Sequence, residues 1–239
     1  MSIFNIFIYQ PILNLTVFLY NLIPGQDLGI VIICLTIFIK ALLFPLNIKS
    51  IKSQKTLSEL EPKIKEIKEK FKNNKEQLAK ETMKIYQNAG INPLSGIFSL
   101  IIQIPILFGL YKVFSKGIFN GEAGILYSFI SSPSVIKTYF LGINLSQPNF
   151  LLTVLAVVSQ FFQTKLSFIK KKDPIKLVKN KNMPDISEIM RKQMLYFFPF
   201  FTFLILLKIS SAISLYLVVS SVFTILQTLY ITQKSKVKS

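Results

Sequence analysis

Long apolar stretches separated by lysine-rich segments are the feature that most constrains how this chain folds. A helix needs about 20 apolar residues to cross the roughly 30 Å hydrocarbon core of a bilayer. Four stretches approach or exceed that length, and a fifth, 194–207, has 14 residues. A soluble domain rarely combines 51% hydrophobic residues with a net charge of +17. We therefore predict an all-α polytopic membrane protein with five membrane helices, at 28–48, 94–114, 150–169, 194–207 and 209–231.

The distribution of basic residues predicts how these helices are oriented. Eleven lysines lie between the first two helices, eight basic residues lie between the third and fourth, and three lysines lie in the tail. Cytoplasmic loops of membrane proteins are enriched in Lys and Arg. We therefore expect segments 49–91, 170–193 and 232–239 to be cytoplasmic, and the N-terminus to lie outside a plasma membrane.

The segments outside the membrane helices differ in character. In 49–91 an apolar seam and a following turn at 72–75 predict a helical hairpin, in which Pro62 is expected to cause a kink or a new helix start. Segment 170–193 has little periodicity and is predicted to be a loop. The seam consists of Leu57, Leu60, Ile64, Ile67 and Phe71.

The N-terminal segment 1–24 leaves two arrangements open. Gln10, Asn14 and Asn21 fall on one side of a helix and form a narrow polar stripe. This stripe favours an interfacial helix on the outer face of the membrane. A sixth membrane helix over residues 3–23 is the alternative.

The composition excludes several kinds of chemistry. The chain has no histidine, which excludes Ser-His-Asp and Cys-His catalysis and ordinary histidine-liganded metal sites. A single cysteine, Cys34, excludes an intramolecular disulfide, and no GxxxxGK[ST] phosphate-binding loop occurs. We therefore predict that the chain is not an enzyme and uses no catalytic residue, cofactor or metal.

Lys40 is the residue that most directly suggests a function. It is the 13th of the 21 residues in 28–48, a depth at which a lysine costs about 2.5–3.5 kcal/mol on insertion scales. Such a side chain should face the interior of the bundle or a water-filled cavity. The alternative is that it extends to the cytoplasmic headgroups. Thr36 lies one turn earlier on the same helix face.

Several uncharged polar side chains accompany Lys40 in the predicted membrane helices. Taken alone, each is better explained by a packing contact between helices than by a binding site. Together with Lys40 they predict a shared polar groove. No Asp or Glu occurs in any of the five helices, so an unpaired ammonium favours a partner with anionic groups over proton-coupled transport. The predicted groove residues are Lys40, Thr36, Gln103, Tyr216, Gln163 and Gln227.

Several motifs resemble the YidC/Oxa/Alb family of membrane protein insertases. Residues 35–46 are similar to the first core helix of that family, and 90–94 with 103–106 are similar to the second. Residues 193–199 and 215–227 are similar to its last two helices. The resemblance covers 11–227, and the absence of a large extracytoplasmic domain is similar to the compact Gram-positive-type YidC.

The resemblance implies a five-helix core with a hydrophilic groove that is open to the cytoplasm and lipid and closed outside. Lys40 stands where the family usually has arginine. Thr36 and Tyr216 match positions of substrate contact, and Gln103 matches a motif glutamine. The sequence 211–213 departs from the family's Pro-Ala-Gly, and Leu217 from its Trp. We therefore expect the outer end of the last hairpin to pack differently.

The resemblance also implies an insertase and chaperone that moves polar tails of nascent membrane proteins through the groove and releases their helices into lipid. The implied partners are nascent membrane proteins, the ribosome, the Sec translocon, the signal-recognition receptor and membrane lipids, with no role for DNA. The basic surface alone leaves open anionic lipid and a polyanion such as ribosomal RNA. Two alternatives remain, a small-solute transporter or channel and a membrane anchor for an RNA-binding loop.

Overall fold

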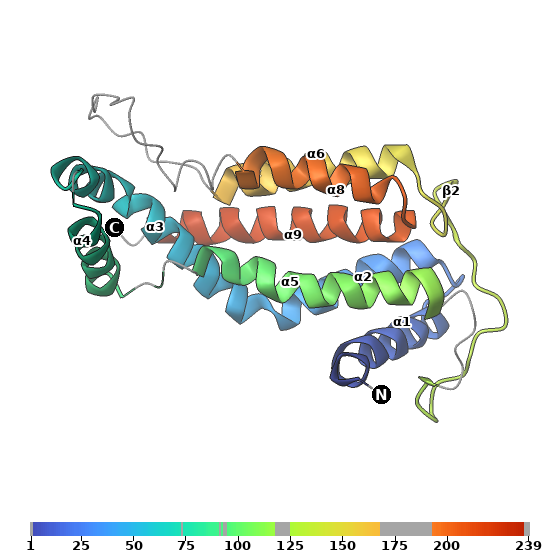
Figure 1. Ribbon diagram of the computed structural model, residues 1–239. Helices are drawn as coiled ribbons and strands as arrows, with labels where there is room; N and C mark the ends of the chain where they lie inside the picture. The colour runs from blue at the N-terminus through green and yellow to red at the C-terminus, as the bar shows by residue number, and fades with distance from the viewer. Residues whose placement is uncertain are drawn as a thin grey trace.

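The computed structural model describes residues 2–72, 74–90, 92, 95–117, 125–167 and 193–236. In these ranges the chain is a bundle of helices with one two-stranded antiparallel hairpin (Figure 1). The elements are η1 Asn5–Tyr9, α1 Gln10–Leu22, α2 Leu28–Leu42, α3 Phe44–Lys70, α4 Lys75–Asn88, α5 Ser95–Lys112, η2 Val113–Gly117, β1 Tyr139–Phe140, β2 Ile143–Asn144, α6 Phe150–Ser167, η4 Gln193–Phe197, α8 Phe198–Leu206 and α9 Ser211–Lys236, where η marks a π-helix.

Helix α9 lies at the centre of the bundle. It packs against α6 and against α2, while α8 packs on α6 and α5 packs on α3. Figure 1 shows α9 running between the α6 and α8 pair and the α2 and α5 pair, with α3 and α4 beyond one end of the bundle. Leu35, Ile213 and Leu206 are among the residues of the buried apolar core, which joins α2, α9 and α8.

The five predicted membrane helices coincide with apolar helices of unequal length. Among the described residues, Phe150–Ser167 and Ser211–Gln233 are each long and apolar enough to cross a bilayer. Leu28–Leu42 and Phe44–Leu60 reach that length only as a pair. The shorter apolar helices are Ile102–Ser115 and Gln193–Leu206. The all-α membrane class is therefore confirmed, whereas the five-helix core stays a prediction.

The continuous helix expected over 28–48 is instead two helices. Helix α2 ends at Leu42, α3 begins at Phe44, and the two are bent by 67°. Pro45 explains the break, because it has no N–H to donate and its ring clashes with the carbonyl of Ala41 four residues earlier. Lys40 therefore lies in the last turn of α2, directly before the bend, and not in the middle of a straight span.

Helices α3 and α4 form the hairpin expected over 49–91. Helix α4 begins after Asn74, whose side chain accepts a hydrogen bond from the backbone N–H of Gln77 at 3.0 Å, as in an ordinary N-cap. Helix α3 continues through Pro62 without ending there, so of the two outcomes expected at that residue, a kink or a new helix start, the new start does not occur. Figure 1 shows this hairpin projecting from one end of the bundle.

The polar stripe of the N-terminal helix contacts protein. Asn14 donates to the carbonyl of Ile125 at 3.2 Å and accepts from the N–H of Tyr127 at 2.7 Å. Gln10 donates to the same carbonyl at 3.1 Å, and Asn21 donates to the carbonyl of Ser131 at 2.8 Å. The stripe therefore binds the backbone of segment 125–137, and it is not a face reserved for water or lipid headgroups.

Several other side chains of the N-terminal residues are apolar and stay exposed. Phe7 and Leu22 are exposed, as are Ile3, Ile6 and Phe18. An apolar surface of this kind fits contact with lipid. No membrane span is assigned to these residues, because α1 has only 13 residues. The choice between an interfacial helix and a sixth span stays open.

The start of α9 is tied to the segment that follows the β-hairpin. The hydroxyl of Ser210 donates to the carbonyl of Leu145 at 2.6 Å, and that of Ser211 donates to the carbonyl of Asn144 at 3.1 Å. The N–H groups of Ser211 and Ala212 also donate to carbonyls of this segment, at 3.0 Å each. The residues that depart from the family's Pro-Ala-Gly thus anchor the turn between α8 and α9.

Candidate functional site

Lys40 points into the bundle from the last turn of α2. Its side chain is directed toward α9, where Nζ donates a hydrogen bond to Thr224 Oγ1 at 3.2 Å. Only 6% of the residue is exposed, so its ammonium is enclosed by protein and does not extend to the membrane surface. Within the described ranges no carboxylate lies at ion-pairing distance from Lys40, and its one hydrogen-bond partner there is a neutral hydroxyl.

Thr36 lies one turn before Lys40 and is completely buried. Its hydroxyl donates to the carbonyl of Ile32 at 2.6 Å, the back-bonded arrangement common for threonine in membrane helices. Its donor is therefore used within its own helix. The hydroxyl oxygen keeps acceptor capacity toward the neighbouring helices.

Tyr216 and Gln103 are brought together although they are 113 residues apart in sequence. The Gln103 side chain of α5 donates to the hydroxyl of Tyr216 on α9. Tyr216 is completely buried, whereas Gln103 is half-buried. This contact joins α5 to α9 on the side of the bundle where α2 also meets α9.

Gln227 lies next to the bend between α2 and α3. Its Nε2 donates to the carbonyl of Phe44 at 3.5 Å, which is long for a hydrogen bond. Its Oε1 is buried and has no partner among the described residues. Gln227 therefore connects the C-terminal half of α9 to the start of α3, and its Oε1 keeps an unused acceptor among the described residues.

Gln163 does not join the other predicted residues. It is half-buried on α6, and within the described chain no hydrogen bond links its side chain to the other five. The structure thus groups Lys40, Thr36, Gln103, Tyr216 and Gln227 around one face of α9. We call this interface of α9 with α2 and α5 the polar seam.

The polar seam includes a row of hydroxyls that sequence analysis did not single out. From Tyr216 to Thr232, every fourth residue of α9 carries a hydroxyl. Each threonine in the row donates to the carbonyl four residues earlier, at 2.8–2.9 Å, and Thr224 also accepts from Lys40. The spacing of one hydroxyl every four residues was the signal in the sequence that could have identified this row. The hydroxyl row consists of Ser220, Thr224, Thr228 and Thr232.

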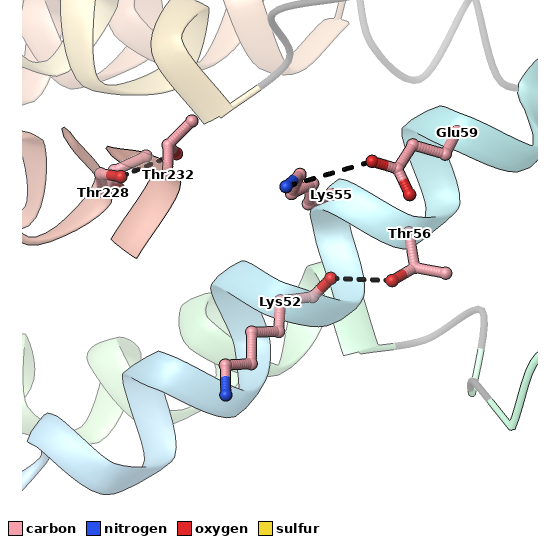
Figure 2. Close-up of polar contacts among 6 residues, drawn as sticks. All are labelled: Lys52, Lys55, Thr56, Glu59, Thr228 and Thr232. Carbon is pink, nitrogen blue, oxygen red and sulfur yellow. Dashed lines mark hydrogen bonds and ion pairs between the residues drawn. The ribbon is translucent and has the colours of Figure 1, made fainter. Parts of the chain in front are cut away.

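The hydroxyl row leads toward α3. A spacing of four residues advances about 40° per step around a helix with 3.6 residues per turn. Its end at Thr228 and Thr232 is drawn beside the first half of α3 in Figure 2, where Lys55 lies 4.0 Å from Glu59. Since α3 and α9 pack together, the row reaches from the middle of the bundle to its lysine-rich end.

The polar seam offers hydrogen bonds and one positive charge. Among the described residues no cluster of three or more His, Cys, Asp or Glu side chains could hold a metal ion. The groups that the seam presents are an ammonium, hydroxyls and amides. Such groups can bind and orient a carboxylate or a peptide group.

Comparison with known proteins agrees with these features. The profile described as 60Kd inner membrane protein matches residues 18–238. "Membrane protein insertase YidC 1" of Listeria monocytogenes serotype 4b is 34% identical over 233 residues, which cover 95% of this chain and 71% of that protein. "Membrane protein insertase YidC" of Fusobacterium nucleatum is 30% identical over 230 residues, which cover 95% of this chain and 98% of that protein.

A longer relative matches over a similar part of this chain. "Membrane protein insertase YidC" of Syntrophus aciditrophicus is 32% identical over 226 residues, covering 95% of this chain but only 36% of that protein. The family match therefore extends over most of this chain in relatives of different lengths. It confirms the resemblance predicted from the motifs, and the chain belongs to the 60Kd inner membrane protein family, that of the YidC/Oxa-type proteins.

Proposed function

We propose that this chain is a membrane protein insertase and chaperone that moves polar tails of nascent membrane proteins through a positively charged groove and releases their helices into lipid. The observation that carries the proposal is the buried Lys40 ammonium, whose partner is the hydroxyl of Thr224 at 3.2 Å. The names of the relatives, membrane protein insertases, support the same class of function.

The charge of Lys40 explains why an acidic tail would bind. Burial removes water from the ammonium, and one neutral hydroxyl offsets only part of that cost. A carboxylate at about 4 Å would contribute about 4 kcal/mol at an effective dielectric constant of about 20. An Asp or Glu in a substrate tail is therefore stabilised in the polar seam more than a neutral residue would be.

Access to Lys40 requires the polar seam to open. One side-chain hydrogen bond joins α5 to α9 at Gln103 and Tyr216, and another joins α2 to α9 at Lys40 and Thr224. The neutral bond between Gln103 and Tyr216 contributes about 1 kcal/mol net, and the bond from the charged Lys40 about 1.5–3 kcal/mol, so a substrate has to replace both with its own polar groups to open the seam. We propose that the opened groove is lined by Lys40, Thr36, Gln103, Tyr216 and Gln227, whereas Gln163 on α6 lies outside the polar seam.

The released helix would then leave sideways into the bilayer. Each Å² of apolar surface transferred from water to hydrocarbon contributes about 25 cal/mol, so a membrane helix is driven into lipid without nucleotide hydrolysis or covalent chemistry. Thr228 and Thr232 would offer hydrogen bonds to a polar tail on its way from the lysine-rich end to Lys40.

The lysine-rich end is proposed to be cytoplasmic, with the N-terminus outside and the C-terminus inside a plasma membrane. Helices α3 and α4 and the ends of α5, α6 and α9 that adjoin lysine-rich sequence lie at the same end of the bundle (Figure 1). This arrangement is what the positive-inside rule requires. At this end the chain would bind its substrate and the ribosome, the Sec translocon or the signal-recognition receptor, through segments 49–91, 170–193 and 232–239.

The test is replacement of Lys40 by Arg and by Glu, followed by insertion of a single-span substrate with an acidic tail. Arg should preserve insertion, because it keeps the charge, and Glu should abolish it. The matched control is Lys208→Glu, at an exposed lysine in the turn between α8 and α9, which should insert normally. A substrate with a neutral tail should depend less on residue 40. Equal insertion by all three residues at position 40 would refute the charge mechanism.

A second experiment separates insertion from transport of small solutes. A photocrosslinker at position 216 should attach to nascent chains during translation, because Tyr216 lies in the polar seam. A transporter or channel requires no such contact. Absence of crosslinks at 216, with crosslinks at a lipid-facing position such as 162, would contradict passage of substrate along this seam.

A further inference from the structure

An apolar hollow lies beside α5, between this helix and the N-terminal residues. It is a largely open hollow of about 580 Å³. Ile104, Pro105, Phe108 and Tyr111 form its wall on α5, and Phe4 closes it from the N-terminal side. Its polar groups come from Lys112 and Ser115 at one end.

The hollow opens away from the proposed groove. At about 100° per residue, Ile104, Phe108 and Ser115 lie roughly 120° around α5 from the face that carries Gln103 and Leu110. Leu110 is completely buried, whereas Phe108 is 61% and Ile104 50% exposed. In a membrane-embedded bundle this exposed face meets lipid, so the hollow is accessible from the bilayer.

Lys112 places a positive charge at the end of the hollow. Its Nζ donates to Asn5 Oδ1 at 3.0 Å and lies 4.1 Å from the centre of the Tyr9 ring. A cation over an aromatic ring is held in position but not neutralised. Within the part of the chain that the structure describes, no carboxylate forms an ion pair with Lys112. The ammonium of Lys112 is therefore held in one orientation and can still attract an anionic group.

The contacts of Lys112 with Asn5 and Tyr9 depend on a close approach between α5 and the N-terminal helix, and this approach does not require a ligand. A Cβ at Gly109 would lie 2.9 Å from Ile8 and 3.0 Å from Ile12. The absence of a side chain at Gly109 favours this close approach of the N-terminal helix to α5, because a Cβ there would force Ile8 or Ile12 to shift. That contact brings Asn5 and Tyr9 to Lys112.

We propose that the hollow is a binding site for one anionic phospholipid of the surrounding bilayer. An acyl chain would fill the space along Ile104, Pro105 and Phe108, and the headgroup phosphate would accept a hydrogen bond from Lys112 Nζ. An apolar hollow with a single oriented cation at one end matches an amphiphile whose negative charge adjoins its hydrocarbon. A basic residue near the membrane surface favours anionic lipid by about 1 kcal/mol, which is roughly fivefold in affinity.

The chain has no tryptophan, so one introduced tryptophan reports on one site. The Phe108→Trp protein is reconstituted into phosphatidylcholine vesicles that contain either brominated phosphatidylglycerol or brominated phosphatidylcholine, which quench tryptophan on contact. Phosphatidylglycerol should quench with about fivefold higher apparent affinity. The matched control is Phe162→Trp on α6, at a position 54% exposed, which should show no preference between the two lipids.

Two further measurements assign the preference to Lys112. In the Phe108→Trp background, Lys112→Gln should remove the preference and Lys112→Arg should keep it. If Lys112→Gln does not fold, high salt replaces it, because screening should weaken the preference in the Phe108→Trp protein that retains Lys112. Equal quenching by both lipids at position 108, or a preference that persists without Lys112 or unchanged at high salt, would overturn the proposal.

Discussion

Asn14→Leu should detach the segment after residue 125 from the N-terminal helix. Asn14 is 2% exposed, and leucine has a similar volume but no polar atoms. The substitution removes two bonds to this segment, from Asn14 Nδ2 to the carbonyl of Ile125 and from the N–H of Tyr127 to Asn14 Oδ1, and one bond within the N-terminal helix, from Nδ2 to the carbonyl of Gln10. It therefore acts on contacts between two parts of the chain that are more than 100 residues apart.

The expected loss follows from the partners that remain. Ile125 keeps Gln10 as a second donor at 3.1 Å, so its carbonyl stays paired. The N–H of Tyr127 has no such replacement in the described structure. Two lost hydrogen bonds at about 1 kcal/mol each, together with part of the penalty for an unpaired N–H, predict that attachment weakens by about 2–4 kcal/mol.

Amide hydrogen exchange in reconstituted protein measures this loss directly. Local opening governs exchange of amides in attached segments, and 2 kcal/mol corresponds to about 30-fold faster exchange. The amide of Tyr127 and its neighbours should therefore exchange at least about 30-fold faster in Asn14→Leu, while amides in α9 should be unaffected.

Asn21→Leu is the matched control on the same helix. Asn21 is exposed and makes one bond to this segment, to the carbonyl of Ser131 at 2.8 Å. Its loss should change exchange by at most about fivefold, as expected for about 1 kcal/mol. Unchanged exchange at Tyr127 in Asn14→Leu, or an equal effect of both substitutions, would refute the assignment of Asn14 as the main attachment point.

Three further predictions concern stability in detergent, measured as the shift in thermal unfolding temperature. Gly29→Ala should destabilise by about 1–3 kcal/mol, because its Cβ would lie 2.1 Å from the Phe140 ring; Phe140→Ala should rescue it, and destabilisation that persists would contradict this cause. Thr224→Val should destabilise by about 2–3 kcal/mol by leaving the Lys40 ammonium without its hydroxyl; the effect should shrink in a Lys40→Met background, and an undiminished effect would argue against the pair. Lys84→Ala should cost at most about 0.5 kcal/mol, since its ion pair with Glu81 is exposed; a larger loss would contradict a surface pair.

The candidate site was partly predictable because intramembrane charge is rare. A lysine without an acidic partner inside an apolar helix has few stable placements, and Lys40 takes an inward one. Its partner was not predictable, because Thr224 is 184 residues away and threonines inside membrane helices usually bond to their own backbone. Thr224 does both, since it donates to Ser220 and accepts from Lys40.

The single helix expected over 28–48 was wrong, and at Pro62 one of the two expected outcomes, a new helix start, does not occur. The signal for the break after Leu42 was present in Pro45, but the length of the apolar run favoured a single helix. At Pro62 the same residue type is accommodated within α3, so proline alone does not decide whether a helix ends.

By itself the sequence determined that this chain is helical, lies in a membrane and carries most of its positive charge in alternate segments. These properties follow from the free-energy cost of placing charges or unpaired backbone groups in hydrocarbon. That cost depends on the residues of each segment alone and not on its neighbours in the fold. Only the tertiary structure decided that the polar stripe of α1 binds segment 125–137 and that Lys40 meets Thr224. Those contacts depend on which helices become neighbours. The packing of α9 against α2 buries apolar side chains from both helices, so the sequence of one helix alone does not determine it.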